Sequence, residues 1–96
     1  MIGEFCILRT RDAGVHCGTV KELAYTHSGA AAVVTDSRRV WRWSKAFSLN
    51  EMAMKGCGED SRISEPVPKI LLTEVIEVIP CSKKAIENLS RSRNGA

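Results

Sequence analysis

The sequence predicts an α+β fold, in which a small antiparallel β-sheet of about five strands carries two short helices. Segments rich in β-branched and aromatic residues alternate with turns that contain Gly and Asp, which is typical of antiparallel strands. Two serines stand in the N-cap pattern of a helix. The length of 96 residues fits one domain, so we expect residues 1–96 to form a single unit with a frayed tail at residues 91–96.

The first half of the chain is predicted to be all strand and turn. Gly14 and Gly29 belong to turns, because glycine adopts positive φ at little cost. Gly18 interrupts a strand, which indicates a bulge or the close approach of another backbone. The tight turns between successive strands predict an antiparallel meander. The predicted strands cover residues 4–10, 15–23, 31–35 and 38–43.

The second half is predicted to hold both helices and a fifth strand. Ser48 and Glu51 form a capping box, and Gly56 stops the helix that follows. Residues 69–79 fit a helical period as well as a strand period, but their density of β-branched residues favours a strand. Ser82 is a predicted N-cap for a last helix over residues 83–90.

Composition narrows the class of protein. The net charge of +3 is too small to indicate nucleic-acid binding by itself. No segment has the pattern of a signal peptide or a transmembrane helix, so we expect a cytoplasmic protein with no membrane contact. None of the four cysteines forms a C-x-x-C pair, which predicts reduced and mostly buried thiols without a metal site.

The densest functional signal is the segment Arg38-Arg39-Val40-Trp41-Arg42-Trp43. On a strand, alternate side chains share a face, so Arg39 lies with both tryptophans and Arg38 lies on the other face. Guanidinium groups suit phosphates, and indole rings suit flat bases. The alternative interpretation is a pair of core tryptophans surrounded by solvated arginines.

The sequence offers no catalytic constellation, and we expect a protein that is not an enzyme and needs no cofactor. His16 and Cys17 are neighbours, but adjacent strand residues point to opposite faces. Glu74 and Glu77 also fall on opposite faces of the predicted strand, so they do not form an acid and base pair.

Several segments together resemble the first family of Thoeris anti-defence proteins, which are small proteins of phages and prophages. The resemblance covers about residues 4–90 and is carried by Arg9-Thr10, Ala13-Gly14-Val15-His16-Cys17-Gly18, Arg38-Arg39-Val40-Trp41-Arg42-Trp43, Ala46-Phe47-Ser48-Leu49, Val67-Pro68 and Leu72-Thr73-Glu74. It implies a non-catalytic sponge that binds cyclic nucleotide signals of bacterial immunity and withholds them from their effectors. The implied ligands are glycocyclic ADP-ribose and cyclic oligonucleotides. The implied assembly is a homodimer, or a hexamer built from three dimers, in the host cytoplasm.

The resemblance also implies a set of ligand-binding residues. A stacking arginine of the family corresponds to Arg38 or Arg39, a polar residue in the late strand to Thr73, and a late arginine to Arg91. The position where the family has an aromatic falls near Ile63, which covers a purine without an equivalent π face. The full set is Arg9, Arg38, Arg39, Trp41, Ile63, Thr73 and Arg91.

This interpretation requires the guanidinium groups of Arg38 and Arg39 to face a shared cavity. Two alternatives remain open at this stage. One is an accessory protein that binds single-stranded nucleic acid, with both tryptophans stacking on bases. The other is a structural or protein-interaction domain, in which the tryptophans are core residues.

Overall fold

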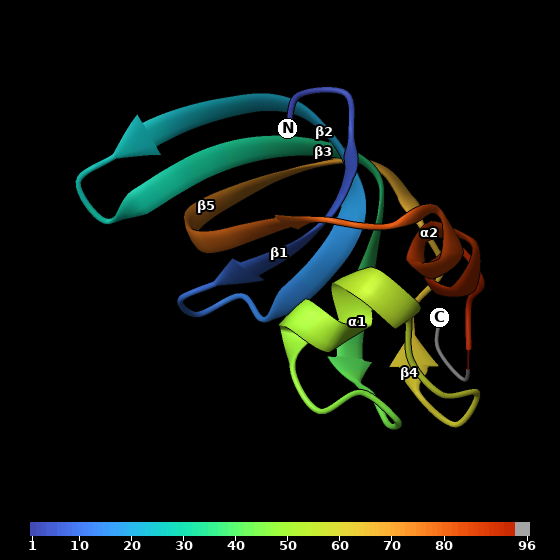
Figure 1. Cartoon of the computed structure of the whole chain (residues 1–96). Helices are drawn as coiled ribbons and strands as arrows, with labels where there is room; N and C mark the ends of the chain where they lie inside the picture. The colour runs from blue at the N-terminus through green and yellow to red at the C-terminus, as the bar shows by residue number, and fades with distance from the viewer. Residues whose placement is uncertain (94–96) are drawn as a thin grey trace.

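The computed structural model describes residues 1–93 and contains an antiparallel five-stranded sheet with two helices, as the sequence predicts (Figure 1). The elements in chain order are β1 (Phe5–Thr10), β2 (Val15–Thr26), β3 (Gly29–Arg42), α1 (Leu49–Lys55), β4 (Arg62–Ile63), β5 (Val67–Pro80) and α2 (Lys83–Leu89). Within residues 1–93, no helix is long and apolar enough to cross a lipid bilayer.

The predicted meander is confirmed for β1, β2 and β3, which pair antiparallel in succession. The predicted third and fourth strands are the single strand β3, and the sheet also closes on itself. The sheet order is β2-β1-β5-β3-β4, and β2 also pairs with β3. The pairings of β1, β2, β3 and β5 thus form a complete circuit, a small barrel, with β4 added at β3. The strand β5 enters between β1 and β3 because its first part pairs with β3 and its last part with β1. The two parts meet at Val75, which pairs with both Ala30 and Thr10, and the preceding residue, Glu74, has a φ of 54°.

The strand β3 joins two segments that the sequence separates at Asp36 and Ser37. Asp36 adopts a φ of 51°, and the register between β2 and β3 shifts close to it, opposite Gly18. A Cβ atom on Gly18 would lie 2.7 Å from Val34 Cγ1 and 2.9 Å from the Thr35 carbonyl oxygen. The close approach predicted at Gly18 is confirmed. The strand β3 continues through the irregular residue Asp36 and does not end there.

Alternating side chains divide the interior into two layers. One layer fills the barrel and includes Cys6, Leu8 and Val34. The other lies between the outer face of the barrel and both helices, and it includes Ile7 and Met52. Figure 1 shows the helices beside one another on the same side of the sheet. Both faces of β1 are therefore buried over most of its length.

The helix starts follow the predicted capping chemistry. Ser48 Oγ accepts a hydrogen bond from the Glu51 amide at 3.2 Å, and the Glu51 carboxylate accepts one from the Phe47 amide at 2.8 Å. Ser82 caps α2 in the same way, and its amide donates to the carbonyl of Ala53 at 2.9 Å. The cap of α2 is thus bonded to α1, which fixes the two helices relative to one another.

The segment after α2 is attached to the domain, so the predicted fraying is wrong for residues 91–93. The amide and the carbonyl of Arg93 both bond to Ile63, each at 2.9 Å. The Arg93 side chain enters the helix layer and donates to Asn88 O at 2.6 Å. The sequence gives no signal for this attachment, because it depends on a two-residue strand far away in the chain. Residues 94–96 lie outside the described part.

All four cysteines are free. Three of them are buried and Cys81 is half-buried, which confirms the prediction of mostly buried thiols.

Candidate functional site

A hollow of about 310 Å³ opens beside the turn between β1 and β2. It contains Arg39 and Trp41 from the end of β3 and Trp43 from just after it, so both tryptophans of the chain line it. The structure therefore brings Arg39, Trp41 and Trp43 together, the three residues that strand alternation assigns to one face. The lining residues are Asp12, Ala13, Gly14, Val15, Arg39, Val40, Trp41 and Trp43.

The turn that walls this hollow is held by its own hydrogen bonds. Thr10 Oγ1 accepts from the Ala13 amide and donates to the Gly14 carbonyl, both at 2.8 Å. Gly14 adopts a φ of 84°, which glycine tolerates and L side chains rarely adopt. The shape of this wall is therefore set by local chemistry before any ligand arrives.

Arg39 is held by hydrogen bonds at its main-chain amide and at the tip of its side chain. Its amide donates to Ser64 Oγ at 2.8 Å, and its Nη2 donates to the Ala13 carbonyl at 3.0 Å. The side chain is nevertheless exposed. It therefore presents further N–H donors to the hollow with little remaining freedom.

His16 forms a second hydrogen bond to the Ala13 carbonyl, on the buried side of the turn. It is buried, it pairs with Arg39 across the strands, and its Nε2 lies 2.9 Å from the Ala13 oxygen. Because a carbonyl only accepts, Nε2 carries a proton. Burial lowers the pKa of the His16 imidazole; the hydrogen bond to the Ala13 carbonyl opposes this shift, and the positive charge of Arg39 adds to it. A neutral histidine therefore braces the wall of the hollow.

The two tryptophans have different surroundings. Trp41 is 53% exposed, with the Arg62 guanidinium 5.2 Å from its ring centroid. Trp43 is half-buried and packs against the helix layer. Trp43 thus has the role that the core interpretation gives to both rings, while Trp41 is about half exposed and has the Arg62 guanidinium over its ring.

A second hollow of about 380 Å³ continues from the first, with Val15 and Trp43 as shared walls. Arg9 lies in it, and its Nε donates to Glu77 Oε1 at 3.0 Å. The remaining lining residues are Ser48, Leu49 and Asn50. We call the residues that line these two hollows the Arg–Trp surface. It gathers Arg9, Arg39 and Trp41 from the predicted ligand set.

Arg38 does not belong to this surface, and the expectation of a cavity shared with Arg39 is wrong. The requirement that both guanidinium groups face one cavity is therefore not met within a single chain, and a nucleotide site in this hollow depends on Arg39 without Arg38. Arg38 donates through Nη1 to Ser64 O at 3.3 Å and to the Ser92 hydroxyl. It lines a separate hollow of about 350 Å³ with Asp36 and Pro66, among others. The reason is strand alternation, because neighbouring residues of β3 point to opposite sides.

The three remaining predicted residues lie elsewhere. Ile63 is fully buried in the helix layer, at 0% exposure, so the prediction that it covers a purine is wrong for this chain. It is buried because β4 pairs with Val40 of β3. Thr73 is exposed on β5, and the exposed Arg91 donates to Glu59 at 2.6 Å. None of the three lines the Arg–Trp surface.

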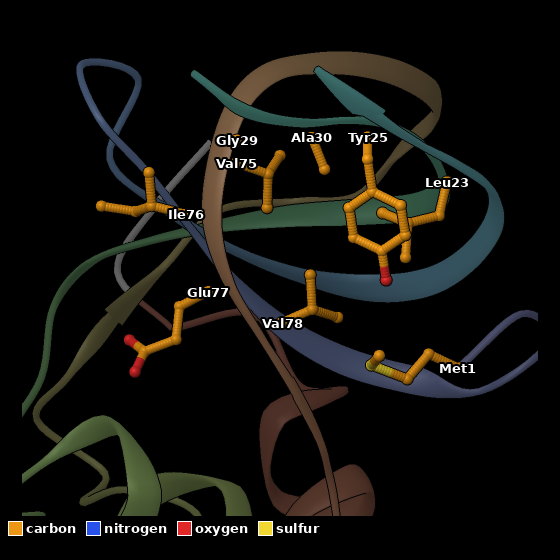
Figure 2. A pocket seen from close by; sticks show the side chains of 9 residues that line it. All are labelled: Met1, Leu23, Tyr25, Gly29, Ala30, Val75, Ile76, Glu77 and Val78. Atoms are coloured by element: carbon orange, nitrogen blue, oxygen red, sulfur yellow. The ribbon is translucent and has the colours of Figure 1, made fainter. Parts of the chain in front are cut away.

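Sequence reasoning missed an apolar hollow of about 330 Å³ between the far end of β2 and β5. Figure 2 shows Leu23, Tyr25 and Val78 around the same space, whereas the carboxylate of Glu77 points away from them. The alternation of Leu23 and Tyr25 on β2 indicates that these two side chains share a face. Because the sequence did not place β5 beside that face, the hollow between them was not predicted.

None of the four cysteines lines the Arg–Trp surface. Burial raises the pKa of Cys17 and Cys81 to about 12 and that of Cys6 to about 11, so these three groups are thiols at neutral pH. Within residues 1–93, no three His, Cys, Asp or Glu side chains are grouped to hold a metal ion. The arrangement at the Arg–Trp surface is suited to gripping phosphates and stacking rings.

Residues 3–89 match a family described as a domain of unknown function (DUF6948). Neither a curated protein nor a solved structure matches the chain.

Proposed function

We propose that this chain, which belongs to the DUF6948 family, is a non-catalytic protein that binds and sequesters cyclic nucleotides. The observation that carries the proposal is the joint presence of Arg39, Trp41 and Trp43 in one hollow. Arg9 lies in the next hollow, across the shared Trp43, where its charge is paired with Glu77.

The physical match is to a ligand with a flat ring and a phosphate. A guanidinium fork binds phosphate oxygens through charge-assisted hydrogen bonds. Indole rings stack on any base, and each stacked base contributes roughly 1–3 kcal/mol. The two hollows have the size range of small-molecule sites. The contacts that hold Arg39 in advance reduce the entropy that binding must otherwise supply.

The proposal assigns capture to this site, with no cleavage of the ligand. The histidine nearest to it is buried and bonded to the Ala13 carbonyl, so its imidazole does not reach a ligand as a base. Three thiols have pKa values far above neutrality. A sponge needs tight binding and chemical inertness, and the groups around the Arg–Trp surface fit both needs.

The resemblance to Thoeris anti-defence proteins supplies the finer part of the proposal. The ligands would be glycocyclic ADP-ribose and cyclic oligonucleotides, in the cytoplasm of a bacterial host. Assembly would be a homodimer or a hexamer of three dimers. In such an assembly, a neighbouring copy is what would bring Arg38, Thr73 and Arg91 to a ligand, since these residues lie off the Arg–Trp surface of their own chain.

The test is native mass spectrometry of the purified protein mixed with a panel of cyclic nucleotides. We expect a bound nucleotide that boiling releases unchanged. Arg39→Ala should weaken binding roughly tenfold or more, because it removes the phosphate-binding fork. Lys84→Ala, an exposed change on α2, is the control and should bind as the wild type does. A released ligand that has been hydrolysed contradicts capture.

A second binding experiment, with a long single-stranded oligonucleotide at several salt concentrations, separates this function from binding of single-stranded nucleic acid. The exposed Trp41 ring under Arg62 would also stack on the bases of a long strand. That function requires binding to a long oligonucleotide that weakens steeply with salt. Such binding without uptake of any cyclic nucleotide would contradict our proposal.

A further inference from the structure

The strand β2 extends past the end of β1 and leaves part of one edge without a partner. The strand β1 pairs with β2 only over residues 15–19 of β2, and Val20 bonds to the segment before β1 on the same edge. Beyond Val20, within residues 1–93, no further main-chain hydrogen bond is made on this edge, while the opposite edge stays paired with β3 as far as Thr26. Figure 1 shows this end of the hairpin, in cyan, projecting from the rest of the sheet.

The turn of the hairpin determines which main-chain groups face the open edge. Only two residues connect Thr26 to Gly29, and the residues that flank a two-residue hairpin loop bond to one another. Main-chain groups in an antiparallel ladder alternate between the two edges, so those of Ala24 also face β3, and those of Leu23 and Tyr25 face outward. These two residues therefore present N–H donors and carbonyl acceptors to an approaching strand.

The side chains along this edge suit a paired strand. Leu23 and Tyr25 lie on the same side of β2, where they line the apolar hollow of about 330 Å³ (Figure 2). Tyr25 is 80% exposed, so its ring has little cover within its own chain. Edge strands commonly block pairing with lysine, proline or a bulge, and residues 23–26 contain none of these. The edge therefore has the composition of a strand that accepts a partner.

A second copy of the same segment is a matching partner. If two β2 edges run antiparallel with Ala24 on the two-fold axis, Leu23 of each copy lies opposite Tyr25 of the other. Both of these pairs lie on the side of the apolar hollow, and aromatic and aliphatic side chains in such cross-strand pairs stabilise a sheet. Glu22 lies opposite Thr26, so no like charges meet within residues 22–26, and the residue on the axis has the smallest side chain of the segment.

We propose that the chain forms a dimer through the open edges of β2, with antiparallel pairing centred on Ala24. The sheet then continues from one copy into the other, and the apolar hollows of both copies lie on the same face of it. Leu23 and Tyr25 of each copy exchange main-chain hydrogen bonds with the other, and the Tyr25 ring gains the cover that its own chain does not provide. The inference rests on the homodimer of the proposed function and adds the surface that forms it.

A disulfide at the two-fold axis tests the register. Ala24 faces its own counterpart in a pair without hydrogen bonds, whose Cα atoms lie about 4.5 Å apart, within the range that a disulfide spans. Ala24→Cys should therefore form a covalent dimer under mild oxidation, measured by mass spectrometry under non-reducing conditions. Glu22→Cys is the matched control and should cross-link far less, because Glu22 lies opposite Thr26 and not opposite its own counterpart. The wild type should not cross-link, since its own cysteines are buried or half-buried.

Light scattering tests whether the same edge holds the native protein together. Tyr25→Lys should lower the mass of the wild-type assembly about twofold, because lysine on an edge strand opposes pairing. Leu71→Lys is the matched control, since Leu71 is an exposed apolar residue of β5, and it should leave the assembly intact. A cooperative melting transition shows that each variant is folded.

Three outcomes overturn the inference: a monomeric wild type, an assembly that Tyr25→Lys leaves intact, and equal cross-linking of the two cysteine variants. None of them affects the capture of a nucleotide, which the mass-spectrometry panel measures separately. A cross-linked dimer that takes up no nucleotide of that panel supports this interface and contradicts capture.

Discussion

The guanidinium group of Arg93 donates to the main-chain oxygen of Asn88 at 2.6 Å, with the side chain only 4% exposed. A second nitrogen, Nη1, donates to Cys57 Sγ at 3.1 Å, while Nε makes no hydrogen bond within the described residues but lies 3.8 Å from Glu59 Oε1. We expect Arg93→Ala to lower the free energy of unfolding by about 2 kcal/mol, because it empties a buried site and removes the side-chain bond to Asn88, while the main-chain bonds to Ile63 remain. Urea denaturation measures this loss.

Arg91→Ala is the matched control for that experiment. Arg91 and its partner Glu59 are both exposed, so we expect a change of less than about 0.5 kcal/mol. Equal losses for the two variants would contradict a specific anchoring role for Arg93.

The different burial of Trp41 and Trp43 predicts different effects of their removal. Trp43→Ala should destabilise the fold by about 2 kcal/mol, because its ring packs against the helix layer. Trp41→Ala should cost less than about 1 kcal/mol, because its ring is 53% exposed, yet it should weaken nucleotide binding. Denaturation curves and calorimetry on the two variants check this separation. Large losses of stability in both would support the interpretation of a core tryptophan pair.

Gly18 is predicted to tolerate no side chain. A Cβ atom there would approach both a side chain and a main-chain oxygen of β3 to less than 3 Å. We expect Gly18→Ala to destabilise the protein by about 1–3 kcal/mol through strain at the junction of β2 and β3. Lys21→Ala, an exposed change on the same strand, should lie within about 0.5 kcal/mol of the wild type in thermal and urea unfolding.

The buried His16 predicts a loss of stability in mild acid. Its pKa in the folded protein is below the ordinary value of 6.5, so the unfolded chain takes up the proton first as the pH falls. Stability from this group is complete above about pH 6.5 and decreases as the pH falls below it. Unfolding free energies measured at about pH 7.5 and about pH 5.5 test this dependence.

Two glutamine variants isolate the contribution of His16. His16→Gln does not titrate and should show a smaller decrease in stability between these pH values. His27→Gln, at an exposed position, should retain the wild-type decrease. A wild-type decrease in His16→Gln would assign the acid sensitivity to other groups.

Much of the local structure could be predicted because it depends on near neighbours in the chain. Ser48 with Glu51, and Ser82 with Ala85, define their helix starts within four residues. The β-branched run after Lys69 decides for a strand in the same local way. Prediction failed where an element depends on distant partners, as for the strand β4, whose two residues pair with β3 and with Arg93.

In the candidate site, too, the features that depend on neighbouring residues could be predicted, and those that depend on distant residues could not. Strand alternation by itself placed Arg39, Trp41 and Trp43 on one face of the chain and Arg38 on the other, because side-chain direction in a strand has a period of two residues. Only the closed barrel decided what covers each face: α1 and α2 bury one layer, Ile63 joins the core, and the segment at Ser92 binds Arg38. The approach of Asp12, Arg9 and Glu77 to the tryptophans was likewise a tertiary result. These residues come from separate strands and a turn, and only the pairing of β5 with β1 and of β2 with β3 brings them to one surface.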